Sequence, residues 1–129
     1  MATDAQYQRL LQFRTALRQF DLWSREAAEA HGLTHVQHQL LLAIRGSSTE
    51  GGPTVGEVAD ALLVKPHTAT ELIDRAHELD LVDRVRDDAD ARRVRLQLTR
   101  HGADTLASLT SVHVEELRRL APLLAPLDA

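Results

Sequence analysis

The chain has 129 residues, a length that fits one domain with a core of its own. Its net charge is −4, from 15 basic and 19 acidic residues, so the overall charge argues mildly against a nucleic-acid partner. The sequence contains no cysteine, which excludes disulfides, thiolate catalysis and thiol redox sensing. No apolar run approaches membrane-spanning length and the N-terminus lacks the apolar stretch of a signal peptide, so we expect a soluble cytoplasmic protein without a membrane partner.

A long helix over residues 4–30 is the first predicted element. Gly32 ends it, because a glycine just past the last turn is a common helix stop. Every aromatic residue of the chain lies within residues 1–23, so the core elsewhere must consist of Leu, Val and Ala. The apolar face recurs at helical spacing and comprises Leu10, Phe13, Leu17 and Phe20, widened by Ala16, Trp23 and Ala27.

Three shorter helices are predicted next. Thr34 and Thr54 are each followed, three residues later, by a side chain that can complete a capping box, so each predicts a helix start. The stretch 46–53, GSSTEGGP, is the clearest loop of the chain and is too short to separate domains. The third of these helices begins near Pro66, a residue that suits the first helical position.

Two strands are predicted at 81–86 and 93–98, with the acidic stretch DDADA between them. The second strand alternates Arg, Arg and Gln with Val, Leu and Leu, which is typical of a half-buried strand. Six arginines fall within 17 residues here, at positions 84, 86, 92, 93, 95 and 100. Such a basic stripe can bind phosphate although the whole chain is acidic. The alternative is a solvated strand surface balanced by Asp83, Asp87, Asp88 and Asp90.

A last helix is predicted over 100–127, interrupted or ended by Pro122 and Pro126. One of its faces carries Leu106, Leu109, His113, Leu117 and Leu120.

The order of these elements predicts a mainly helical α+β fold with a small β-hairpin wing. The helices over 55–63 and 67–79, joined by a brief turn, are typical of a helix-turn-helix, and a hairpin directly after them makes it a winged helix. The second helix would enter the DNA major groove, and the arginines of the wing would grip the backbone or the minor groove.

The sequence resembles the multiple antibiotic resistance regulator (MarR) family of bacterial transcription factors. The resemblance rests on PTVGEVADALLV, TATELIDRAHELDLVDRV, DADARRVRLQLT and LTRHG, with the wing signature at Asp90-Ala91-Arg92 and the Leu-Thr-x-x-Gly pattern at 98–102. It implies a repressor that binds a palindromic operator as a homodimer and is released by a small aromatic or phenolic ligand. It implies a single domain over 1–129, with dimerisation helices at 4–32 and 100–127 and the winged helix-turn-helix at 33–99.

The apolar faces of the first and last helices favour the same dimer independently, because a small winged helix has little core to cover them. The alternative is that both helices pack only on their own domain.

Candidate DNA contacts follow from the resemblance and from position along the recognition helix and wing. Asp90 is expected to pair with an arginine and to support the wing. The predicted contacts are Lys65, His67, Thr68, Thr70, Arg75, Arg92, Arg93 and Arg95.

Three positions depart from the family pattern. Lys65 stands where a capping Ser or Thr is usual, Glu71 where an arginine is frequent, and Asp80 where a glycine is usual. Glu71 could accept a hydrogen bond from a cytosine amino group. It could also pair with Arg75 four residues later, and we favour this pair.

A ligand pocket is predicted between the lobes, lined by Phe20, Trp23, His31, His35 and His38, because apolar surface there lies beside polar side chains. In the alternative interpretation Trp23 only fills the dimer interface. The histidines, with His113, also allow a zinc-responsive regulator, although we expect no metal and no cofactor. A winged helix that binds protein and not DNA is a further alternative. No nucleophile motif or phosphate loop predicts an enzyme.

Overall fold

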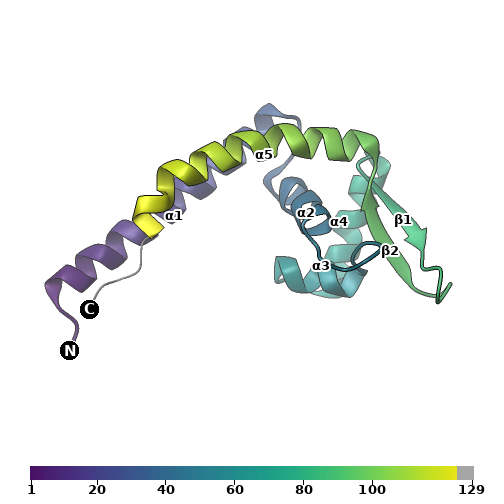
Figure 1. Ribbon diagram of the computed structural model, residues 1–129, viewed down its shortest axis with the longest axis horizontal. Helices are drawn as coiled ribbons and strands as arrows, with labels where there is room; N and C mark the ends of the chain where they lie inside the picture. The colour runs from purple at the N-terminus through teal and green to yellow at the C-terminus, as the bar shows by residue number, and fades with distance from the viewer. Residues whose placement is uncertain (125–129) are drawn as a thin grey trace.

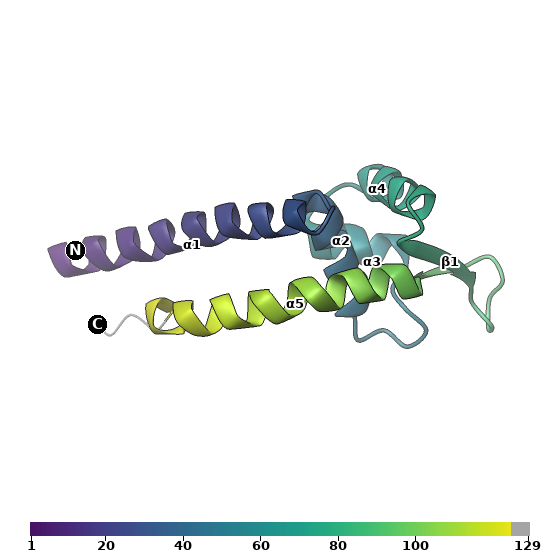
Figure 2. The ribbon, with the colours of Figure 1, turned by 90° about the horizontal axis from the view of Figure 1, so that it is seen from above.

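The computed structural model describes residues 1–124, which form two lobes. A winged-helix lobe is joined to an arm in which the first and last helices run side by side (Figures 1 and 2). The predicted mainly helical fold with a two-stranded wing is confirmed. Residues 125–127 of the predicted last helix, including Pro126, lie outside the described residues. The elements are α1 (Asp4–Ala30), α2 (His35–Arg45), α3 (Val55–Leu62), α4 (Pro66–Glu78), β1 (Val82–Arg86), β2 (Val94–Leu98), α5 (Arg100–Leu120) and the short 3-10 helix η1 (Ala121–Leu124).

The helices begin where side chains can satisfy their first N–H groups. The capping boxes predicted at Thr34 and Thr54 are confirmed, and Thr3 forms a third one that starts α1. Helix α4 differs, because Lys65 precedes it without any side-chain cap and Pro66 occupies its first turn. The N-terminal end of α4 therefore keeps N–H groups that no side chain of the preceding residue satisfies.

Two turns of the winged-helix lobe use a left-handed backbone at residues other than glycine. Leu63, between α3 and α4, and Asp80, between α4 and β1, both have φ of 58°. Asp80 stands where the family pattern has glycine, and its conformation explains that preference. The Asp80 carbonyl accepts a hydrogen bond of 2.6 Å from the Thr99 hydroxyl, which ties this turn to the start of α5.

The core lies inside the winged-helix lobe. It is formed by α2, α3, α4, both strands and the first half of α5. The start of α5 packs closely on the residue before β1. A Cβ at Gly102 would lie 2.1 Å from the Leu81 carbonyl oxygen, so only glycine allows this approach. Antiparallel pairing joins Val82 to Leu98 and Arg86 to Val94. The largest fully buried side chains include Leu40, Leu41, Ile73, Leu96 and Leu109.

The arm leaves much of its apolar surface uncovered by its own chain. Leu10 and Leu17, expected on the apolar face of the first helix, are exposed, and so is Leu117 of α5. The helices α1 and α5 extend beyond the core, and the short η1, which contacts both of them, leaves these side chains uncovered (Figure 2).

Candidate nucleic-acid interface

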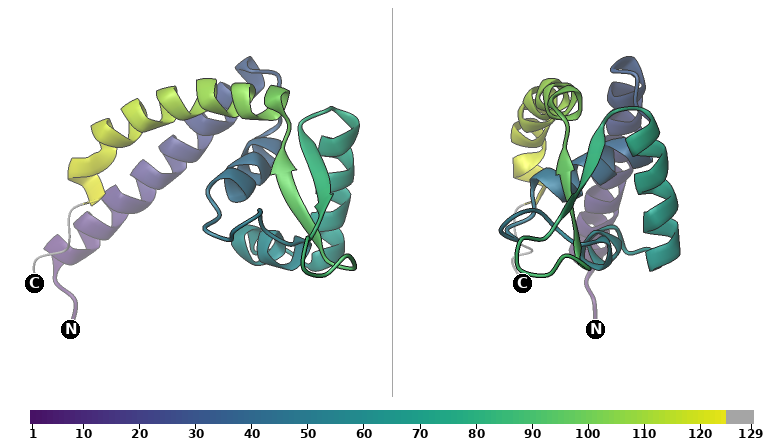
Figure 3. Two further views of the ribbon diagram at one scale, coloured as in Figure 1. Left: turned by 45° about the vertical axis from the view of Figure 1, so that its right-hand side comes forward. Right: turned by 90° about the vertical axis from the view of Figure 1, so that its right-hand side faces the viewer.

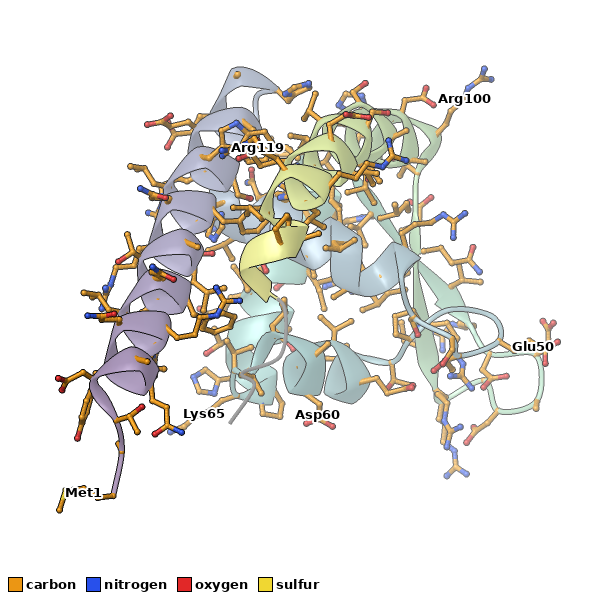
Figure 4. The ribbon with its side chains drawn as sticks, turned by 60° about the vertical axis from the view of Figure 1, so that its left-hand side comes forward. Met1, Glu50, Asp60, Lys65, Arg100 and Arg119 are labelled. Carbon is orange, nitrogen blue, oxygen red and sulfur yellow. The ribbon has the colours of Figure 1, made fainter. Side chains whose placement is uncertain are left out.

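The N-terminal end of α4 and the tip of the wing lie at the same end of the winged-helix lobe (Figure 3). Lys65 and Asp60 mark this end in Figure 4, whereas Arg100, the sixth arginine of the sequence stripe, lies at the opposite end. The fold therefore divides the arginine stripe. Its wing-tip members share a surface with α4, and Arg100 does not.

The first turn of α4 presents polar side chains to solvent. Lys65, His67 and Thr70 are exposed, and Thr68 is half-buried. The Thr70 hydroxyl donates to the Pro66 carbonyl oxygen at 3.1 Å, so its proton is engaged within the helix while its oxygen can still accept and its methyl group can make apolar contacts. These four predicted contact residues thus lie together on one exposed helix end.

Further along α4, the predicted pair between Glu71 and Arg75 is wrong. Both side chains are exposed, and among the described residues no ion pair joins them. Asp74 instead forms an ion pair with Arg84 of β1. This contact braces the recognition helix against the wing, and sequence analysis missed it because its partners come from two different elements.

The wing tip is organised around Asp90. Its Oδ1 accepts the Arg92 backbone N–H at 3.0 Å and lies 3.5 Å from Arg92 Nε. The Arg92 side chain is 94% exposed, and Arg93 is also exposed. The supporting role of Asp90 stays a prediction, and this geometry is what such a role requires.

Arg95 requires a correction, because its side chain does not face outward as a DNA contact would. Only 15% of it is exposed, and its guanidinium binds Asp87 at 3.0 Å and the Gly52 carbonyl oxygen at 3.3 Å. Glu57 lies 3.7 Å from the same guanidinium. Two carboxylates therefore compensate its charge inside the lobe.

The two carboxyl groups near Arg95 are held in their charged forms. The hydrogen bond from the Ala89 backbone N–H and, to a smaller extent, the contact with Arg95 keep the pKa of Asp87 below its usual value. The hydrogen bond from the Thr49 hydroxyl and, to a smaller extent, the one from the Thr54 backbone N–H lower the pKa of Glu57.

Three of the residues predicted to line a ligand pocket, Phe20, Trp23 and His38, gather around the ring of His113. Phe20 and Trp23 of α1 pack on the ring of His113, which Trp23 approaches to 4.8 Å between ring centroids. The ring of His38 also contacts His113, with 4.5 Å between the two ring centroids. His31 is exposed and bonds to the Ala27 carbonyl oxygen of its own helix. Sequence analysis placed His113 on a face of the last helix and in the metal alternative but not in the pocket, yet it is the centre of this stack.

His38 is neutral at ordinary pH. It is 3% exposed, and burial, with the neighbouring His113, His35 and His31, lowers its pKa to about 4. The Nδ1 atoms of His35 and His38 are buried without a hydrogen-bond partner in the described part of the chain. An open depression of about 750 Å³ is lined by Trp23, Ser111 and Val112.

The zinc alternative finds no support among residues 1–124. These residues contain no cluster of three or more His, Cys, Asp or Glu side chains that could hold a metal ion. Both nitrogens of His113 are already engaged, since Nδ1 donates to the Leu109 carbonyl oxygen at 2.8 Å and Nε2 accepts from Ser24 at 2.6 Å.

A membrane-spanning segment was not expected, and none of the helices in the described range combines the length and apolar character needed to cross a bilayer.

Comparison with known proteins identifies relatives of the winged-helix lobe and of the whole fold. The model of the MarR family matches residues 31–93. A transcriptional regulator of the helix-turn-helix type from Bacillus subtilis, YsmB, is 37% identical over 68 residues, which are 53% of this chain and 47% of that protein. The chain thus matches about half the length of this curated relative.

Two solved structures show the same fold. AbsC, a MarR family transcriptional regulator from Streptomyces coelicolor, aligns with a TM-score of 0.77 at 24% identity over 98% of this chain and 85% of its own. MepR of Staphylococcus aureus in complex with DNA aligns with a TM-score of 0.72 at 22% identity over 97% and 87%. These matches are transcriptional regulators and not enzymes, in agreement with the expectation of no catalytic activity.

Proposed function

We propose that this chain, which belongs to the MarR family of winged-helix transcriptional regulators, binds double-stranded DNA as a homodimer and represses transcription from a palindromic operator. One observation carries the proposal. The uncapped first turn of α4 and the exposed arginines of the wing tip share one end of the lobe. A helix end can enter the major groove while the wing reaches the adjacent backbone or minor groove.

The residues at this end divide into two roles. His67, Thr68 and Thr70 lie in the first turn of α4, the part of a recognition helix that meets base edges. Lys65, Arg92 and Arg93 supply positive charge for phosphate contacts. Arg75, further along α4, is exposed, forms no ion pair with the residues that the structure describes, and adds to the same charge.

The homodimer is supported by the uncovered apolar surface of the arm. Tyr7, Leu10, Leu11 and Leu17 of α1 are exposed, and Leu117 of α5 joins them. Burying such surface against a second copy would stabilise both chains, and a two-fold arrangement would present two recognition helices to two half-sites.

A small aromatic effector is the proposed release signal. The stack of Phe20, Trp23 and His113 offers aromatic surface at the joint between arm and lobe, and the ring nitrogens of His35 and His38 that lack partners among the described residues offer hydrogen-bonding groups. A ligand there would loosen DNA binding if it preferred an arrangement in which the two recognition helices no longer match successive major grooves.

The test begins with selection of duplexes from a randomised pool by the parent protein. Affinity for a selected duplex is then measured by fluorescence anisotropy at several salt concentrations. We expect Arg92→Ala to weaken binding to all duplexes about equally, because a wing arginine contacts phosphate or recognises the shape of the groove. The magnitude of the slope of log affinity against log salt concentration should fall by about 1.

Arg100→Ala is the matched control, since it removes an exposed arginine at the far end of the lobe (Figure 4). It should bind like the parent. If the parent enriched no duplex and bound DNA without salt dependence, the DNA-binding proposal would fail. The acidic net charge and the exposed Glu71 would then favour a protein-binding winged helix.

A further inference from the structure

We infer that Arg95 is a positioning residue that sets the angle of the wing by joining three segments of the lobe, and that it makes no contact with DNA itself. The inference rests on the proposed function. It assigns to one arginine of the wing a role opposite to the one that its sequence pattern predicts.

Arg95 lies between three segments of the winged-helix lobe. It lies on β2, opposite Val85 of β1 in the antiparallel register. Its Nη2 binds Asp87 Oδ2 at 3.0 Å at the root of the wing loop, while its Nη1 donates to the Gly52 carbonyl oxygen at 3.3 Å. Nη1 also lies 3.7 Å from Glu57, whose carboxylate caps α3. One side chain thus connects the wing, the α2–α3 loop and the helix ahead of α4.

The α2–α3 loop is also fixed to β2 by a backbone hydrogen bond. The Leu96 N–H donates to the Pro53 carbonyl oxygen at 2.8 Å, and the Gln97 side-chain amide donates to Gly51 at 3.1 Å. A Cβ on Gly52 would lie 2.2 Å from the Leu96 carbonyl oxygen, so only glycine allows this close approach. The base of the hairpin is therefore rigid, and Arg95 extends this attachment to the wing loop.

Asp87 extends this attachment to the tip of the wing. Its backbone N–H donates to the Arg93 carbonyl oxygen at 2.9 Å, across the open end of the loop. Its Oδ1 accepts the Ala89 N–H at 2.9 Å, while Oδ2 is held by Arg95. Both carboxylate oxygens are in use, and each fixes a different segment. The position of the exposed Arg92 and Arg93 therefore depends on the bond between Asp87 and Arg95.

The negative charge of Asp87 allows a test in which the two interpretations predict opposite changes in DNA affinity. DNA repels carboxylates, so removing an acidic charge from a DNA-binding surface should tighten binding or leave it unchanged. If Asp87 instead positions the wing, Asp87→Asn should weaken binding although it removes a negative charge. An asparagine has only one acceptor oxygen and cannot serve both Ala89 and Arg95.

The experiment compares Asp87→Asn with Asp88→Asn on a duplex of about three helical turns (about 30 base pairs) selected by the parent protein. Asp88 is the matched control, because it is the adjacent aspartate, is exposed and has no bond or ion pair within the described residues. We expect Asp87→Asn to weaken affinity about three- to tenfold and Asp88→Asn to leave it equal or slightly tighter.

Arg95→Lys adds a second, independent readout. A lysine keeps the positive charge but cannot form the fork that holds Asp87 and Gly52 together. We expect it to weaken DNA binding as much as Asp87→Asn does, and the double variant to lose no more than either single one, because both changes break the same link. Circular dichroism at the assay temperature verifies that all variants are folded.

Two results would overturn the inference. One is Asp87→Asn binding as tightly as Asp88→Asn or tighter. The other is Arg95→Lys binding like the parent, which would mean that Arg95 serves DNA only as a charge. Neither result resembles a failure of the proposed function, in which the parent itself would not bind the selected duplex.

Discussion

At the level of single residues, Leu63 holds a left-handed backbone conformation in the turn between α3 and α4, and 92% of its surface is exposed. It therefore contributes almost no burial to offset the strain of its φ of 58°. We predict that Leu63→Gly raises the free energy of unfolding by about 0.5–1 kcal/mol, because glycine adopts this conformation without the clash of a Cβ. Thermal denaturation followed by circular dichroism measures the change.

Ala61→Gly is the control for this variant, since Ala61 is exposed on the preceding helix. It should lower stability by about 1 kcal/mol, as glycine does in helix interiors. Destabilisation by Leu63→Gly as well would show that the left-handed turn carries no removable strain.

His38 leads to a prediction about pH. Its pKa is about 4 in the folded chain, against 6.5 for an ordinary histidine. Between these two values the unfolded chain binds more protons, so this group makes stability fall as the pH decreases from about 7 to 4. At about 1.4 kcal/mol for each pKa unit, the loss is at most about 3.5 kcal/mol. Urea denaturation at a series of pH values measures it.

Replacing His38 by a side chain that does not titrate distinguishes its contribution to the loss of stability in acid from that of the carboxylates. His38→Gln should remove much of the acid loss in that range, even though it changes stability at neutral pH. His67→Gln, at an exposed histidine, should behave like the parent. An identical pH dependence in the parent and in His38→Gln would mean that His38 is not a buried neutral group.

At the level of elements, α4 combines a free first turn with a braced body. Its start has no side-chain cap, and its middle is tied to β1 through Asp74 and Arg84. We predict that His67→Ala changes the motif recovered by selection from a randomised pool, because the first turn of a recognition helix meets base edges. Glu78→Ala, at the other end of the same helix, should recover the parent motif, and an unchanged motif in both would count against base contact by His67.

Sequence reasoning was accurate for these elements where the signal is local. The capping threonines at 34 and 54, with their partners three residues later, gave the starts of α2 and α3. It failed for contacts between elements distant in sequence. Arg95 appears in the sequence as one more outward arginine of an alternating strand. Its partners Gly52 and Glu57 come from another part of the chain, and only the fold brings them within reach.

At the level of the whole molecule, the arm presents an apolar surface that its own chain does not cover. Leu10 and Leu17 lie seven residues apart on one face of α1, and both are exposed. We predict that Leu10→Glu combined with Leu17→Glu raises the dimer dissociation constant by about a hundredfold or more, because two charges would be buried without partners. Sedimentation velocity measures it. Leu79→Glu, an exposed leucine at the end of α4, should leave the dimer intact.

The central claim is that two copies of the chain bind one DNA duplex through their winged helices. Native mass spectrometry of the parent protein with a duplex selected from a randomised pool tests it most directly. We predict one duplex bound by two chains of 14.3 kDa, on a palindrome whose half-sites are about one helical turn apart. A complex with a single chain, or a dimer that binds no duplex, would contradict it.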